Sequence, residues 1–161
     1  MTTILRRVVT AAAIVATAGL LSAPAAFAGG EHGGGGGRTI LRAELAGSLT
    51  TDPVLFGTTP GGADWVIGDG EARLRQNGRL DVRVEGLVLT STGANPVPQL
   101  AASIACNGTV VVTTAIVPFS PTGDAVIHAR VALPERCIAP VVLLNPRGNA
   151  AVYIGVTGTE A

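Results

Sequence analysis

The densest group of side chains that could carry out chemistry lies between Asp64 and Glu71, where Asp64, Asp69 and Glu71 surround Trp65, the single tryptophan of the chain. Carboxylates beside an aromatic ring could serve a glycosidase or hold a sugar. Their oxygens could also bind calcium, but the spacing is not that of an EF-hand. We take Asp64, Trp65, Asp69 and Glu71 as candidate ligand-binding residues. The competing interpretation, which we favour, is structural: Asp69-Gly70 forms a turn, Glu71 pairs with Arg83, and Trp65 fills the core or covers a sheet edge.

Other catalytic chemistry has little support in the sequence. All 11 basic residues are Arg, so a catalytic Lys is excluded, and no Ser lies in a Gly-x-Ser-x-Gly elbow. His128 is the only His beyond the Gly-rich segment, and the alternation of its strand places it facing solvent. Two Cys and two His do not form a four-ligand zinc site. We therefore predict no catalytic residue, no metal and no cofactor, and favour a binding or structural protein over an enzyme.

Cys106 and Cys137 are the only cysteines. Because the N-terminal segment has the features of a secretory signal, the two cysteines are predicted to form a disulfide bond. Closing a loop of this length would stabilise the domain by about 3–4 kcal/mol. No Cys-x-x-Cys motif indicates a redox role.

The N-terminal segment predicts export from the cell. Arg6 and Arg7 precede a short apolar run, and Ala26-Phe27-Ala28 has the small-x-small pattern of a cleavage site. Residues 1–28 are thus predicted to be a signal peptide cleaved after Ala28, which makes the protein secreted and extracellular. The apolar run is too short for a membrane anchor. Residues 29–37 are predicted to be a Gly-rich flexible spacer. Balanced charge, with 11 basic and 11 acidic side chains, argues against nucleic-acid binding.

Residues 38–158 are predicted to form one all-β domain, an antiparallel sandwich or barrel-like fold. Gly and Pro interrupt short runs rich in Val and Thr at the spacing typical of such folds. The strands are expected at residues 39–47, 63–67, 70–76, 79–89, 99–106, 109–117, 124–133, 138–144 and 150–157.

One hairpin can be predicted in register. A three-residue loop, Gln76-Asn77-Gly78, pairs Leu74 with Leu80 and places both on the buried face, whereas a two-residue turn would put charge into the core. The same register sets Arg73 across from Asp81 and Glu71 across from Arg83. A second hairpin is expected to turn at Asn107-Gly108.

Several segments resemble small secreted actinobacterial proteins of unknown function. They are Ala43–Gly47, Asp64–Leu74, Asn77–Leu89 and, as a second hallmark, Leu133–Val142. The order Leu-x-Gly, Gly-Glu-Ala, Gly-Arg-Leu and Glu-Gly-Leu is also similar to CHRD-type extracellular domains. The resemblance implies an extracellular compartment and an all-β fold, and it brings no catalytic residues.

Three functions follow as hypotheses. The leading one is a secreted, non-enzymatic β-sandwich with a structural or binding role outside the cell, toward a protein or carbohydrate partner. The second is a small secreted hydrolase or sugar-acting enzyme that uses Asp64, Asp69 or Glu71. The third is a secreted protease inhibitor that presents a loop such as 118–123.

Overall fold

The computed structural model describes residues 37–159, so the predicted signal peptide and most of the spacer lie outside the described residues. Within this range the chain forms strands and no helix, which confirms the all-β fold class. The strands are β1 (Thr39–Gly47), β2 (Thr59–Pro60), β3 (Trp65–Val66), β4 (Asp69–Arg75), β5 (Arg79–Glu85), β6 (Val88–Leu89), β7 (Gln99–Cys106), β8 (Thr109–Thr113), β9 (Val117–Pro118), β10 (Ala125–Arg130), β11 (Val141–Pro146), β12 (Val152–Tyr153) and β13 (Gly155–Thr157).

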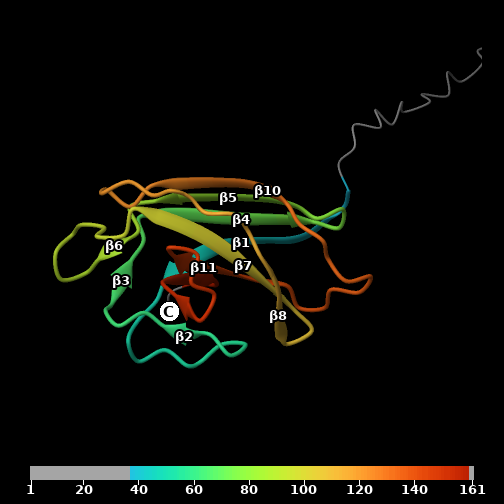
Figure 1. Ribbon diagram of the computed structural model, residues 1–161, viewed down its shortest axis with the longest axis horizontal. Helices are drawn as coiled ribbons and strands as arrows, with labels where there is room; N and C mark the ends of the chain where they lie inside the picture. Colours follow the sequence, from blue (N-terminus) through green and yellow to red (C-terminus); the bar gives the residue numbers. More distant parts are fainter. Residues whose placement is uncertain (1–36, 160–161) are drawn as a thin grey trace, which may run out of the picture. The chain divides into compact units, whose positions relative to one another are not determined.

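The long strands form one curled antiparallel sheet, a half-barrel, in the order β10-β5-β4-β1-β13-β11-β7-β8. Figure 1 shows β10, β5, β4 and β1 running side by side, with β7 crossing them at an angle. The curl is centred on β1, whose first residues pair with β4 while Leu45–Gly47 pair with β13. A strand shared in this way lets two halves of a sheet face each other across a common core.

Aliphatic side chains fill that core. Alternate residues of β4 and β5 are fully buried, as the period of two in a strand requires. In β7 and β11 nearly every residue is buried, because their second face is covered as well. Segments 58–61 and 149–154 pair with each other in a second layer, where Thr59 and Gly61 donate to the carbonyls of Ala151 and Tyr153.

The β4–β5 hairpin has the predicted register, with Leu74 opposite Leu80, Arg73 opposite Asp81 and Glu71 opposite Arg83. Gly78 adopts φ +79° at the turn, a left-handed conformation that favours glycine. A Cβ at Gly78 would also collide with the carbonyl of Val131, whose N–H donates to Gly78 O at 2.9 Å. The turn is thus joined to the chain after β10.

Several predicted strands are too long. The strand expected at 79–89 ends at Glu85, because Gly86 turns the chain with φ +67° and the N–H of Leu87 donates to the carbonyl of Gly123. The next residues form β6 against β3. The runs at 109–117 and 150–157 are each divided into two strands, and β2 was not expected. The prediction of a turn at Asp69-Gly70 is wrong, since both residues belong to β4.

The predicted disulfide joins Cys106 and Cys137, with 4.9 Å between the Cα atoms. Cys106 ends β7, whereas Cys137 lies in the loop before β11 rather than at its start. The predicted Asn107-Gly108 turn is confirmed between β7 and β8. Asn107 also binds the crosslinked loop, since its amide donates to Arg136 O at 2.8 Å and accepts from Ile138 N at 2.9 Å. Turn and disulfide therefore hold the same segment.

Candidate ligand pocket at the Trp65 end

Trp65 lies where the chain leaves β1 and returns to the sheet. Its backbone N–H donates to Ser48 O at 2.8 Å, and a Cβ at Gly47 would collide with its carbonyl. It pairs with Leu89 of β6 and is only 5% exposed. The expectation that Trp65 belongs to the core is confirmed, but its ring also forms part of the wall of a cavity.

The cavity has a volume of about 650 Å³, within the usual size of small-molecule sites. Its walls come from the end of β1, the loop after it, β3, β13 and the C-terminal residues that follow. The lining is mostly apolar and consists of Ala46, Gly47, Leu49, Asp52, Pro53, Leu55, Trp65, Val66, Thr90, Tyr153, Val156, Gly158 and Thr159.

The rim of this pocket exposes apolar side chains to solvent. Leu49 is 47% and Val66 is 40% exposed, and both line the pocket. Val54, in the same loop, is 60% exposed. Single exposed aliphatic residues are common, but a group of them around a cavity indicates a binding site.

Hydrogen bonds hold the loop of residues 49–55 over the pocket. Asp64 accepts from the backbone N–H of Thr50 at 2.7 Å and from its hydroxyl at 2.8 Å. The backbone hydrogen bond, reinforced by the hydroxyl, lowers the pKa of Asp64. Asp52 closes the turn itself, accepting from Leu49 N at 2.9 Å. Asp64 is therefore a positioning residue for one wall of the pocket.

Tyr153 also anchors the loop of residues 49–55. Its hydroxyl donates to Pro53 O at 2.8 Å, across 100 residues of sequence. Burial, with a smaller contribution from the nearby charge of Asp52, raises the pKa of Tyr153, so its hydroxyl stays neutral and remains a donor. Tyr153 is not among the candidate residues taken from the sequence, although it lines the pocket. The available signal was the apolar pair Val54-Leu55 in a segment otherwise typical of turns.

The other two candidate residues lie outside this pocket. Glu71 is on the outer face of β4 and forms ion pairs with Arg42 at 2.7 Å and Arg73 at 3.3 Å. The hydrogen bond from Arg42 is the main reason that the pKa of Glu71 is lowered. Asp69 lies opposite Glu85 in the register. Of the four residues grouped by the sequence, Trp65 lines the pocket and Asp64 holds its loop, whereas Asp69 and Glu71 belong to the sheet.

The predicted partners on the sheet also change. Arg83 is opposite Glu71, as expected, but its ion pair is with Glu85 on its own strand. Asp81 binds Arg79 at 3.1 Å and His128 at 2.9 Å, although Arg73 lies opposite it. Residues two apart on a strand share one face, so long Arg side chains can reach them as easily as a cross-strand neighbour. His128 is exposed, as predicted.

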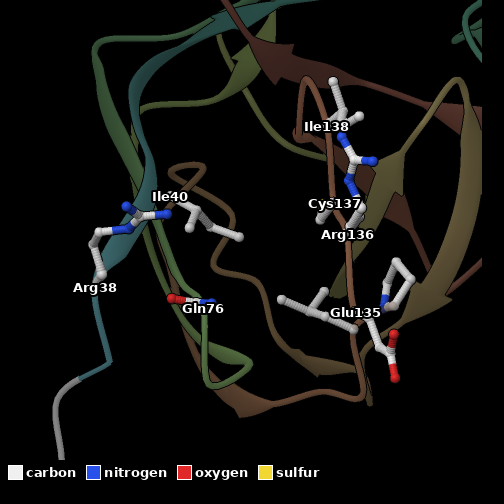
Figure 2. Close-up of a pocket in the computed structure, with 9 residues that line it drawn as sticks. Arg38, Ile40, Gln76, Glu135, Arg136, Cys137 and Ile138 are labelled. Carbon is white, nitrogen blue, oxygen red and sulfur yellow. The ribbon is translucent and has the colours of Figure 1, made fainter.

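A second cavity, of about 540 Å³, lies beside the disulfide. Figure 2 shows Arg38, Ile40 and Gln76 on one side and the segment from Glu135 to Ile138 on the other. Its lining carries charges of both signs, and its one cysteine, Cys137, is in the disulfide.

The geometry defines a half-barrel with an apolar pocket at the Trp65 end and a polar pocket beside the disulfide. Among residues 37–159, no group of three or more acidic, His or Cys side chains is arranged to hold a metal ion. Those residues also contain no helix long and apolar enough to cross a membrane. Comparison with known protein families, with characterised proteins and with solved structures finds no match to this chain.

Proposed function

We propose that this protein is a secreted, non-enzymatic binding protein that holds a small apolar or amphiphilic molecule in the Trp65 pocket. The observation that carries the proposal is the pocket with its exposed apolar rim, Leu49 and Val66. Filling the cavity would remove this apolar surface from water, which contributes about 25 cal/mol per Å². The disulfide and the signal-like N-terminus support an extracellular role.

The chemistry of the lining favours an apolar ligand over a carbohydrate. Sugars stack on exposed ring faces, whereas Trp65 is 5% exposed and Tyr153 is fully buried. The Tyr153 hydroxyl already donates to Pro53, and Asp52 already accepts from Leu49. Thr90 and Thr159 remain as polar groups that could orient one polar end of an amphiphile.

The other two hypotheses gain no support from the geometry. A glycosidase that works through carboxyl groups needs one that stays protonated near neutral pH and acts as the general acid. The pKa values of Asp64 and Glu71 are instead lowered by their hydrogen-bond donors. The disulfide would hold an inhibitor loop at 118–123 rigid only if the two were adjacent. Pro118 pairs with Gln99 at one end of β7, and Cys106 is at the other end, about 23 Å away at the rise of a strand.

The proposal can be tested with an anilinonaphthalene sulfonate dye, an apolar fluorophore with one charged group. Trp65 is the only tryptophan, so its emission reports on this pocket alone. We expect saturable energy transfer from Trp65 to the dye in the folded mature protein. Val66→Asp should weaken dye binding at least tenfold, because it places a charge on the apolar rim.

Val111→Asp is the matched control, since Val111 is also a strand valine, is 38% exposed and lines none of the pockets described above. It should bind the dye like the unmodified protein, with both variants first shown to be folded by circular dichroism. Absence of saturable transfer, or equal loss in the two variants, would refute the proposed function.

A further inference from the structure

The outer face of the β10-β5-β4-β1 half of the sheet carries an ordered pattern of charge. The residues that point outward alternate with the buried core residues along each strand. The acidic and basic ones are Arg42 and Glu44 on β1; Asp69, Glu71, Arg73 and Arg75 on β4; Arg79, Asp81, Arg83 and Glu85 on β5; and Asp124 and Arg130 at the two ends of β10.

The strand register gathers these charges into rows across the sheet. Arg130 of β10 is opposite Arg79 of β5. Arg75 and Arg79 are the next residues toward the 76–78 turn after the Leu74–Leu80 pair, so three arginines form a row there. At the other end Asp69 is opposite Glu85. Asp124 adjoins Glu85, just before the Ala125–Val84 pair. We call these sets the cationic row (Arg75, Arg79, Arg130) and the acidic row (Asp69, Glu85, Asp124). Arg79 and Glu85 are six positions apart along β5, which separates the two rows by about 20 Å.

The two inner rows continue the gradient. The row beside the cationic one contains Arg42, Arg73 and Asp81, and the row beside the acidic one contains Glu44, Glu71 and Arg83. The charge of the face therefore changes from positive to negative along the strands. Intramolecular ion pairs do not cancel it. Arg75, Arg130, Asp69 and Glu44 take part in none of the ion pairs formed among residues 37–159.

The pattern is complementary to itself when it is turned around. Consider two copies of this face packed against each other and related by a twofold axis. If the axis lies between the two sheets and is perpendicular to the strands, each strand faces the same strand of the second copy, running in the opposite direction. Arg75 then faces Asp69 of the second copy, Arg79 faces Glu85 and Arg130 faces Asp124. The inner rows match in the same way, with Arg73 against Glu71, Arg42 against Glu44, and Asp81 against Arg83. Each Arg, Asp and Glu of these rows meets an opposite charge, and His128, which is opposite Asp81 in the register, faces Val126.

We infer that this face is a homodimer interface, in which a second copy of the chain binds in the antiparallel orientation. Exposed ion pairs are individually weak and are screened by salt, so the contact is a transient, salt-dependent one whose geometry is selected by charge. The twist of the sheets turns facing strands by about 30°, which makes the contact closest along the middle of β4 and β5. The inference is independent of the Trp65 pocket.

The test uses charge reversal in the mature protein and sedimentation velocity. At an ionic strength of about 0.01 M the Debye length is about 30 Å, longer than the face, and at about 1 M it is about 3 Å. We expect a concentration-dependent dimer at the lower value and a monomer at the higher one. An anionic variant, Arg75→Glu with Arg79→Glu, should raise the dimer dissociation constant at least tenfold. A cationic variant, Asp69→Arg with Glu85→Arg, should do the same.

Mixing the two variants gives the sharpest result. In a heterodimer the two introduced glutamates of one chain would face the two introduced arginines of the other. An equimolar mixture should therefore dimerise at low salt although neither variant does alone. The chain with all four substitutions should regain the homodimer. Melting temperatures establish that each variant is folded. A wild-type monomer at low salt, or a dimer that persists in both two-residue variants, would overturn the interface.

Discussion

The two ends of the half-barrel differ in how they are closed. Arg38 and Ile40, at the start of β1, line the cavity beside the disulfide, whereas Ala46 and Gly47, at the end of the same strand, line the Trp65 pocket. At the first end a covalent bond joins Cys106 to Cys137. At the second, hydrogen bonds from Thr50 to Asp64 and from Tyr153 to Pro53 O hold a loop in place.

The two kinds of closure suit two different roles, stability at one end and binding at the other. A covalent crosslink limits the unfolded chain strongly but leaves little freedom to admit a ligand. A loop held by a few hydrogen bonds can open at small cost and admit a ligand to the apolar lining of the pocket. The disulfide end is therefore expected to determine stability, and the Trp65 end is expected to bind.

The largest effect should come from breaking the core that both ends share. Leu80 is fully buried in β5 near the disulfide end. Leu80→Asp should reduce the free energy of unfolding by about 3–5 kcal/mol, because it buries an unpaired charge. Denaturant unfolding can be followed by Trp65 emission and by circular dichroism. The loss in free energy of unfolding should be the same from both signals, which would show that the domain unfolds as one cooperative unit.

Asp81→Leu is the control on the opposite face of the same strand. Asp81 is in contact with Arg79 and His128 on the solvent side, so its replacement should cost about 1 kcal/mol or less. If Asp81→Leu were the more damaging change, the assignment of the two faces would be wrong.

The next effect isolates the disulfide end. Cys106→Ser should lower the free energy of unfolding by about 3–4 kcal/mol, since the bond closes a loop between cysteines 31 residues apart. At a temperature where the variant is still folded, dye binding at the Trp65 pocket should stay within about twofold of the unmodified protein. A folded variant that loses the pocket would contradict the separation of the two ends.

The smallest effect is expected at the Trp65 end, where the conformation of the 49–55 loop should depend on pH. The pKa of Asp64 is lower in the folded chain than its ordinary value of 3.8. The stabilisation from its bonds to Thr50 is therefore complete above about pH 4 and is lost as the pH falls through the folded pKa. Below pH 4 the 49–55 loop should loosen, which Trp65 emission would report as a shift to longer wavelength.

Asp64→Asn keeps an acceptor for Thr50 but cannot titrate, so this part of the acid transition should be absent from it. The pKa values of Asp124 and Glu71 are lowered too, by their hydrogen bonds to Thr122 and Arg42 respectively. Global unfolding in acid should therefore remain in the variant. Identical Trp65 titrations in both proteins would show that Asp64 does not hold the loop.

Short-range patterns in the sequence determined the fold class, the β4–β5 register and the disulfide. Alternation along Arg79–Glu85 leaves one face that can be buried, and a shift by one residue would bury charge, so the register follows from the strand itself. With only two cysteines in the chain, only one intramolecular disulfide is available. Strand ends were predicted less well, because Gly86 and its neighbours take their conformation from distant contacts such as Leu87 with Gly123.

Only the tertiary structure decided where binding surfaces form. The Trp65 pocket needs the 49–55 loop and Tyr153, which are about a hundred residues apart and meet because β1 pairs with β13. Asp69 and Glu71 are close to Trp65 in sequence but belong to a different surface, since β4 leads them onto the sheet. The charged rows likewise depend on the register among four strands. A period of two assigns each residue to a face, but the neighbours across that face are fixed by non-local pairing.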